Sequence, residues 1–171
     1  MPRAAPIATA VWTAPVEGWY KLNVDTSLRA IDCLVGLGAV VRDCNGLFMA
    51  GLSQKLVGSV SIEIAEAVAI LNGLQLAINS GFTHIIDESD AFNVVNFITQ
   101  ACPLKYEVGL IILDILSLSS RANVSFSFVP RSANSVAHAL ARYSFCICNV
   151  LIWLEDASAW LDKGLLSDLH A

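Results

Sequence analysis

The sequence predicts a mixed α/β domain whose sheet is antiparallel on one side and parallel on the other, with helices on both faces. Two observations predict this class. The first part of the chain shows strand patterns joined by a tight turn, and the rest alternates helical and strand patterns. Strands of a hairpin pair antiparallel, whereas strands joined through a helix pair in parallel. We therefore expect a five-stranded sheet in the order strand, strand, strand, helix, strand, helices, strand, helix.

Five segments carry the strand patterns. Residues 19–25 alternate, with Tyr20, Leu22 and Val24 on one face. Two apolar runs then flank the segment 43–46 (Asp-Cys-Asn-Gly), which predicts a hairpin because Asn and Gly tolerate positive φ in tight turns. Residues 83–88 have the composition of a short buried parallel strand, and residues 123–129 alternate again before Pro130 stops them.

Helical spacing marks the segments between and after these strands. The longest predicted helix covers residues 59–79, with Ser59 or Ser61 as its N-cap and Gly81 after its end. Three further helices are expected over residues 91–100, 104–119 and 132–146.

The length of 171 residues suits one domain. We place that domain at residues 18–147. Residues 1–17 are rich in Ala and Pro and predict a flexible lead-in. Residues 148–171 form a C-terminal tail that could be helical, at a position the sequence does not determine.

The composition bears on location. Hydrophobic residues make up 56% of the chain, but its longest apolar stretches, 108–118 and 145–154, are shorter than the roughly 18 residues that a membrane span needs. We therefore expect no membrane partner. The N-terminus does not resemble a secretory signal, and the five scattered cysteines predict free thiols, so we expect a protein that is not secreted. Nucleus and cytoplasm both remain open.

The net charge of −5 is unfavourable for nucleic-acid binding through a generally basic surface. A nucleic-acid function would therefore need a local site, and three acids offer one. Asp25 ends the first strand, Glu66 lies early in the long helix, and Asp90 follows the fourth strand. If the first and fourth strands are neighbours, these carboxylates meet and would hold Mg²⁺ or Mn²⁺. Spacing alone also fits three solvated surface charges.

The sequence resembles the ribonuclease H type 1 family, in particular the plant branch related to retrotransposon reverse transcriptases. The resemblance spans residues 12–146 and includes Trp12 and Gly18 in the lead-in. It rests mainly on five segments in order: 21–25 (KLNVD), 36–43 (GLGAVVRD), 65–67 (AEA), 88–90 (ESD) and 129–141 (VPRSANSVAHALA). It implies the ribonuclease H-like fold.

The resemblance also implies a function. Members of the family cut the RNA strand of an RNA–DNA hybrid, leaving a 3′-hydroxyl and a 5′-phosphate, with two Mg²⁺ ions or with Mn²⁺. The metal ligands would be Asp25, Glu66 and Asp90. The candidate nucleic-acid contacts are Asn134, Arg131, Thr26 and Ser27.

Three positions depart from the family pattern. His138 stands where the family has its fourth carboxylate, and a neutral imidazole is a poor Mg²⁺ ligand. We include His138 among the catalytic candidates because histidine titrates near neutrality and can transfer protons. Thr26 replaces a glycine and adds bulk beside the site. Asp87 replaces a buried apolar residue, so it must be paired, exposed or protonated.

These departures keep a second hypothesis open. The chain could be a catalytically weakened module of retroelement origin that binds nucleic acid or another protein. A 3′–5′ exonuclease is disfavoured, because no second acid follows Asp25 in the first strand. The sequence leaves open the oligomeric state, the substrate sequence preference and whether the chain stands alone or is part of a larger protein.

Overall fold

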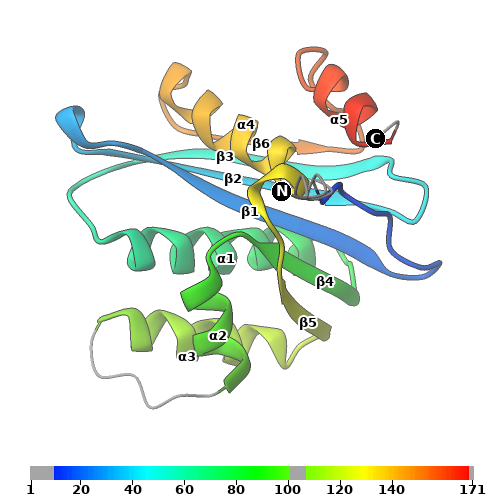
Figure 1. Ribbon diagram of the computed structural model, residues 1–171, viewed down its shortest axis with the longest axis horizontal. Coiled ribbons are helices and arrows are strands. Elements are labelled where there is room, and N and C mark those ends of the chain that lie inside the picture. The colour runs from blue at the N-terminus through cyan, green and yellow to red at the C-terminus, as the bar shows by residue number, and fades with distance from the viewer. Residues whose placement is uncertain (1–9, 101–106, 170–171) are drawn as a thin grey trace, which may run out of the picture.

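The computed structural model describes residues 10–100 and 107–169, which form one six-stranded sheet with helices on both faces (Figure 1). The strands lie in the order β5-β4-β1-β2-β3-β6. Their bounds are β1 Tyr20–Arg29, β2 Leu34–Arg42, β3 Phe48–Val57, β4 His84–Ser89, β5 Asn123–Phe128 and β6 Val150–Leu154.

The sheet changes from antiparallel to parallel at β1. Strand β1 pairs antiparallel with β2, and β2 with β3, whereas β4 runs parallel to β1 and β5 parallel to β4. The predicted mixed sheet is therefore confirmed. The switch matters because the carboxyl ends of β1 and β4 lie side by side.

The number of strands is corrected from five to six. Residues 150–154 of the predicted tail pair antiparallel with β3, and α5 (Asp162–Leu169) follows them. The sheet therefore extends beyond the predicted boundary at residue 147. The segment has five apolar residues in a row, so its sequence shows no alternation that would identify a strand at a half-exposed edge.

Three helices cover one face of the sheet and two cover the other (Figure 1). Helices α1 (Ile62–Asn79), α2 (Phe92–Gln100) and α3 (Glu107–Ser119) lie on the first face. Helix α4 (Ser135–Tyr143) and α5 lie on the second. The segment 101–106, where the helix 104–119 was predicted to begin, lies outside the described residues, as does Cys102. The other four cysteines are free thiols.

Helix α1 forms the centre of the main core. Its Ile70 and Leu74 are buried among core residues that include Leu22 and Val24 of β1. The Ser61 hydroxyl accepts a hydrogen bond from Ile64 N–H at 3.3 Å, so Ser61 is the N-cap. By length and composition alone α1 could cross a membrane. Its buried face against the sheet is typical of a core helix in a globular domain.

Helix α4 lies directly on strand β2 because two glycines of that strand have no side chain. A Cβ atom at Gly36 would collide with the carbonyl oxygen of Ala141, and one at Gly38 with that of Ala137. This close approach determines the position of α4 over the sheet. His138, between these contacts in the sequence, consequently reaches β1.

Within the predicted lead-in, Trp12 and Thr13 contact the sheet. Trp12 is 4% exposed, and its indole Nε1 donates to Asn23 Oδ1 at 2.9 Å. The Lys21 ammonium donates to the carbonyl of Thr13 at 2.6 Å. The sequence did not indicate this because the polar face of the first strand resembles a solvent-exposed one.

A candidate metal centre

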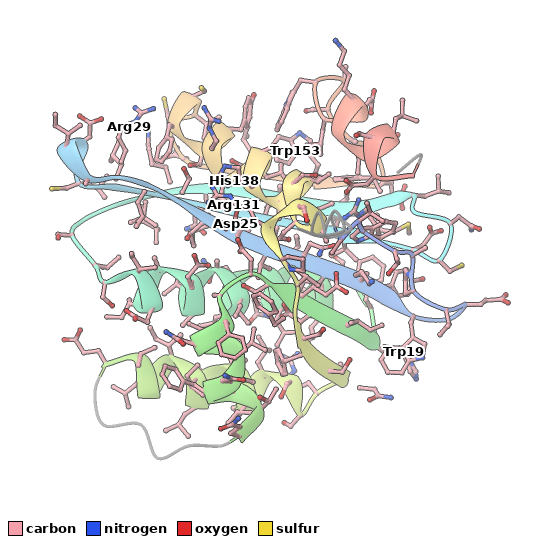
Figure 2. All side chains as sticks on the ribbon, viewed as in Figure 1. Trp19, Asp25, Arg29, Arg131, His138 and Trp153 are labelled. Carbon is pink, nitrogen blue, oxygen red and sulfur yellow. The ribbon has the colours of Figure 1, made fainter. Side chains whose placement is uncertain are left out.

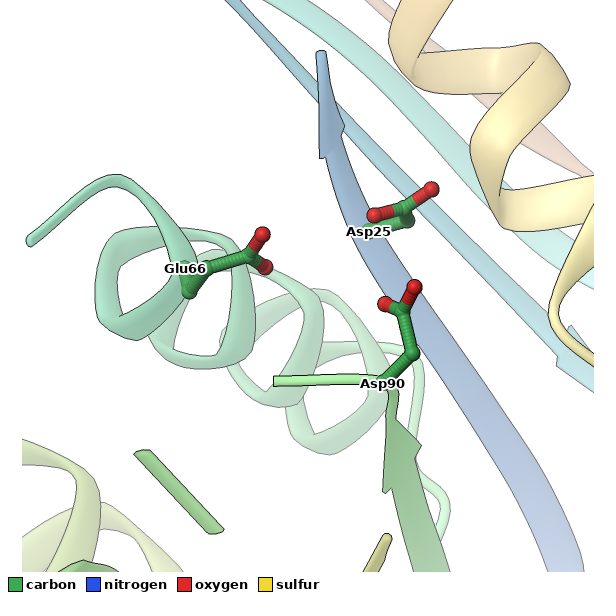
Figure 3. Close-up of side chains that lie close together, drawn as sticks. All are labelled: Asp25, Glu66 and Asp90. Carbon is green, nitrogen blue, oxygen red and sulfur yellow. The ribbon is translucent and has the colours of Figure 1, made fainter. Parts of the chain in front are cut away.

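Three carboxylates from three different elements converge at one end of the sheet (Figure 3). Asp25 lies on β1, Glu66 on the second turn of α1, and Asp90 directly after β4. The register pairs Val24 with Ser89, so the next residue along each strand is an acid. One oxygen from each carboxylate lies within 4.8 Å of the others. The predicted convergence of these acids is therefore present.

Burial and mutual repulsion make this cluster unfavourable when all three groups are ionised. Burial raises the pKa of Asp25 to about 8, with further contributions from the charges of Asp90 and Glu66. Burial likewise raises the pKa of Glu66 to about 7, although a hydrogen bond from Thr26 opposes the shift. Without a counter-charge the cluster retains protons at neutral pH. A cation would remove that cost.

The donor atoms fit a divalent metal ion. The Oε1 atom of Glu66 accepts a hydrogen bond from the Thr26 hydroxyl at 2.6 Å, while Oε2 is buried without any hydrogen-bond partner. A buried carboxylate oxygen that has no partner is costly unless an ion occupies its lone pairs. Three carboxylates are hard ligands of the kind that Mg²⁺ and Mn²⁺ prefer.

His138 contacts the first-strand acid (Figure 2). Its Nδ1 lies 2.7 Å from Oδ2 of Asp25. The Arg131 guanidinium also contacts the ring, with Nη2 at 3.1 Å from His138 Nδ1 and 3.0 Å from Nε2. Burial and the charges of Arg131 and Arg142 lower the pKa of His138 below its usual value. The imidazole is therefore neutral at pH 7, and the contact with Asp25 is a hydrogen bond and not an ion pair.

The side chain of Asn134 is buried and not available to a substrate. It is 1% exposed, and its Nδ2 donates to the backbone carbonyl of Val24 at 2.8 Å and to Asp90 Oδ1 at 3.3 Å. In this structure the amide nitrogen of Asn134, a candidate nucleic-acid contact, is bonded within the protein. The amide instead ties the start of α4 to β1 and orients one of the acids.

The other predicted contact residues lie near the acids in different ways. Thr26 faces α1, where its hydroxyl holds Glu66. Its backbone N–H donates to Asp25 Oδ1 at 2.7 Å. Ser27 is half-buried on the next position of β1 and does not bond to the acids. Arg131 is exposed at the rim of the site.

A hollow of about 230 Å³ opens beside the acids and was not foreseen from the sequence. Glu66 and Asp90 line one side of it, and Phe92 and Asn93 of the following segment line another. The wall of this hollow next to the carboxylates is therefore polar and aromatic. No periodic signal in the sequence indicates this hollow, because its wall comes from two separate segments.

A buried polar network behind the site was also missed. Lys21 forms an ion pair with Glu88 at 2.8 Å, and Asn23 donates to the same carboxylate at 2.9 Å. The Arg42 guanidinium donates to Asn23 at 3.1 Å and stacks on Trp12, 3.7 Å from the ring centre. These residues lie in the segments that resemble the ribonuclease H type 1 family. Part of that shared sequence is therefore needed for folding.

Of the three states expected for Asp87, namely paired, exposed or protonated, only the last agrees with its surroundings. It is 1% exposed, and neither carboxylate oxygen has a hydrogen-bond partner. Burial raises its pKa well above the usual range, with Glu88 adding a smaller effect. The group is therefore protonated in the folded protein at neutral pH.

Comparison with known proteins identifies the family to which this chain belongs. The family model described as reverse transcriptase-like matches residues 23–144. A curated Arabidopsis thaliana protein, named "Putative ribonuclease H protein", is 31% identical over 144 residues, which is 80% of this chain. The chain spans only 22% of the length of that relative.

Solved structures share the fold. The N-terminal RNase H domain of Rv2228c from Mycobacterium tuberculosis has a TM-score of 0.68 at 24% identity, over 75% of this chain and 94% of that one. RNase H1 of Halobacterium salinarum has a TM-score of 0.69 at 22% identity, over 75% and 98%. LC11-RNase H1, solved with an RNA/DNA hybrid, has a TM-score of 0.66 at 17% identity, over 73% and 95%. The chain belongs to the reverse transcriptase-like family, as a ribonuclease H-like domain of the plant retroelement type.

Proposed function

We propose that the protein is a metal-dependent endonuclease that cleaves the RNA strand of RNA–DNA hybrids. The observation that carries this proposal is the convergence of Asp25, Glu66 and Asp90 within 4.8 Å at the end of two parallel strands. Membership of the family supports it, as does the hybrid bound to LC11-RNase H1. The negative net charge favours a local, cation-dependent site over a basic binding surface.

The three carboxylates would hold Mg²⁺ or Mn²⁺, in a one- or two-ion arrangement. Bound there, divalent ions supply the charge that activates water and stabilises the leaving oxygen of a phosphodiester. The protein's own contribution is to keep the oxygens close and correctly oriented. Thr26 does this for Glu66 through its hydroxyl, and Asn134 for Asp90 through its amide.

The protein must also allow the acids of the site to lose their protons. Asp25 and Glu66 have raised pKa values and must lose their protons before they can bind a cation. His138 is neutral and its Nδ1 contacts Asp25, so it adds no negative charge beside the carboxyl that must ionise. Arg131 at the rim adds a positive charge that suits an incoming phosphate.

One observation favours the second candidate, a catalytically weakened module that binds nucleic acid or protein. Both oxygens of Asp25 already have partners, because Oδ1 accepts the Thr26 N–H and Oδ2 contacts His138. A fourth carboxylate at position 138 would add negative charge where the imidazole adds none. Metal affinity should therefore be lower than in an all-carboxylate site.

The test separates the two candidates. Purified protein is incubated with an end-labelled RNA–DNA hybrid and either Mg²⁺ or Mn²⁺, beside Asp25→Asn and Asp90→Asn. Products with 3′-hydroxyl ends that the variants do not form would support the endonuclease. Hybrid binding without cleavage in either metal would favour the weakened module. Neither binding nor cleavage would contradict every nucleic-acid role.

A further inference from the structure

Three exposed arginines form a row that leads away from the candidate metal centre. Arg131 lies at the rim of the centre, and Arg142 lies one helical turn beyond His138. Arg29 is the last residue of β1. Figure 2 shows Arg131 beside Asp25, with Arg29 farther out toward the C-terminal end of α4. The chain has ten lysines and arginines against fifteen acids, so this row is a local feature and not part of a generally basic surface.

One side of the row is a single face of α4. The 3₁₀ turn Ser144–Cys146 continues α4 directly, so His138, Arg142 and Phe145 stand at positions i, i+4 and i+7 of one helical stretch. Side chains at this spacing share a face. Two contacts agree with this arrangement. The charge of Arg142 contributes to the lowered pKa of His138, and the Arg29 guanidinium lies over the Phe145 ring, 4.4 Å from its centre.

The other side of the row is strand β1. Asp25, Ser27 and Arg29 alternate along the strand and therefore point to the same side. Asp25 contacts His138, and Arg29 contacts Phe145, so the strand and the helix run side by side over this length. Four residues of strand cover about 13 Å, and seven residues of helix cover about 10 Å. The two elements therefore form one continuous surface that starts at the acids.

The outer edge of β1 is open along this surface. Strand β4 pairs with β1 only as far as Val24, whereas β2 pairs with it up to Arg29. Within the described parts of the chain, no strand therefore pairs with the outer edge of residues 25–29. A bound chain could lie along this edge and reach the acids without displacing a strand.

The guanidinium groups of the row can bind an anion. Among residues 10–100 and 107–169, neither Arg131 nor Arg142 forms an ion pair with a carboxylate. Arg29 has Asp32 at 3.6 Å, but both side chains are about half exposed, so solvent screens that pair. The planar fork of arginine matches the geometry of a phosphate group. Since the row begins where a phosphodiester would meet the metal ions, the anions that fit it are further phosphates of the same strand.

We infer that Arg142 and Arg29, together with Arg131, bind successive phosphates of the nucleic-acid strand that the metal centre cuts. The inference rests on the proposed function and adds the path of that strand across the protein. At roughly 3.4 Å of strand per nucleotide, a row of about 13 Å covers about four nucleotides on one side of the cut. An acidic protein surface would also suit exposed arginines, but it would not require the row to begin at the metal centre.

The first test is the salt dependence of hybrid binding. A fluorescent RNA–DNA hybrid is titrated with the whole chain in a chelating buffer, where it is not cut, at several salt concentrations. Each arginine that contacts a phosphate adds nearly one to the slope of log affinity against log salt. The double variant of Arg29→Gln and Arg142→Gln should therefore bind at least about tenfold more weakly and with a slope smaller by nearly two. Arg121→Gln is the matched control, because Arg121 is an exposed arginine that follows α3 on the opposite face, and it should bind like wild type.

A second measurement does not depend on how well a variant folds, because each variant is compared with itself. A single neutral methylphosphonate linkage, carried by one 2′-deoxynucleotide of the RNA strand, is moved one position at a time to either side of the cut. In wild type we expect slower cleavage, or weaker binding if the protein does not cut, for linkages within about four nucleotides on one side only. Arg142→Gln should lose the sensitivity at one of these positions and keep it at the others, and Arg121→Gln should lose none.

The outcomes separate this inference from the proposed function. A wild type that neither binds nor cleaves the hybrid contradicts both. A wild type that binds or cleaves, but whose salt slope is unchanged in the double variant, overturns the inference alone and assigns the row to another polyanion, such as an acidic protein. Methylphosphonate effects that are the same in wild type and Arg142→Gln would overturn it as well.

Discussion

His138 Nδ1 lies 2.7 Å from Oδ2 of Asp25, so the residue that replaces an acid contacts the first-strand acid directly. The contact joins α4 to β1 and lies beside the three converging carboxylates. A neutral imidazole adds no negative charge to the three carboxylates. When no cation is bound, this contact therefore relieves charge repulsion. The same contact is expected to reduce the affinity for a cation.

Replacing His138 by aspartate should therefore strengthen metal binding. We expect the Mg²⁺ concentration for half-maximal hybrid cleavage in His138→Asp to fall by about tenfold or more, the scale on which groups around a metal change its affinity. Without metal, the added acid should lower the midpoint of thermal unfolding. His138→Asn is the control, since it keeps a polar neutral side chain. Equal Mg²⁺ dependence in wild type and His138→Asp would contradict the prediction.

The raised pKa values predict how stability depends on pH in the absence of metal. The carboxyl of Asp25 has a pKa of about 8 in the folded protein, against 3.8 in the unfolded chain. Its stabilising effect on the fold is therefore complete below pH 4 and is lost as the pH rises to 8. Asn cannot ionise, so Asp25→Asn should gain thermal stability relative to wild type across this window. The measurement is unfolding in a chelating buffer at several pH values. A difference that does not change with pH would contradict the assignment.

The acids were predictable because each stands next to a recognisable segment at the end of an element. Asp25 and Asp90 could be brought together once β1 and β4 were expected to be parallel neighbours, and both follow the paired residues Val24 and Ser89. The helix that brings Glu66 was predictable from its spacing and its cap. Spacing alone also fitted three surface charges, so it was the resemblance to the ribonuclease H type 1 family that identified these acids as the centre of the site.

Other features could not be predicted, because they depend on contacts between distant segments. Strand β6 depends on pairing with β3, which a run of five apolar residues does not specify. The buried state of Trp12 requires Asn23 and Arg42 to lie beneath it. Asn134 was named as a candidate nucleic-acid contact, and nothing local in the sequence indicates its bond to the Val24 carbonyl.

Thr26 offers a test of how Glu66 is oriented. Thr26→Val keeps the shape of the side chain but removes the hydroxyl that donates to Glu66 Oε1. Glu66 then loses a bond that favours its charged form, so its pKa should rise further and metal affinity should fall by roughly tenfold. Thr26→Ser retains the hydroxyl and should stay close to wild type. Mn²⁺ titration followed by calorimetry measures both, and equal affinities in the two variants would rule out this role.

The buried ion pair between Arg42 and Asp168 should make α5 important for stability. Arg42 Nη1 donates to Asp168 Oδ2 at 2.7 Å, and both side chains are almost fully buried. Removing one partner leaves an uncompensated buried charge, so Asp168→Ala should lower the free energy of unfolding by about 3 kcal/mol. Asp156→Ala, at an exposed position, should change it by less than about 0.5 kcal/mol. Urea unfolding measures both, and equal effects would refute the role of the pair.

A neutral substitution of Asp87 on β4 should stabilise the fold, whereas a neutral substitution of the adjacent Glu88 should destabilise it. Asp87 is buried without a partner and remains protonated, so unfolding at neutral pH releases its proton and is favoured. Asp87→Val removes that penalty and should stabilise the protein by about 1–3 kcal/mol at pH 7. Because the folded-state pKa is raised, the gain should be small near pH 4 and should grow as the pH rises.

Glu88→Gln is the matched comparison. Glu88 accepts from both Lys21 and Asn23, so its neutral form leaves the Lys21 ammonium buried without a counter-charge and should destabilise the fold. The free energy of unfolding of wild type, Asp87→Val and Glu88→Gln is measured at pH 5 and pH 8. If Asp87→Val were less stable than wild type at both pH values, the carboxyl would have a stabilising role in the core, and its protonated, unpartnered state would be refuted.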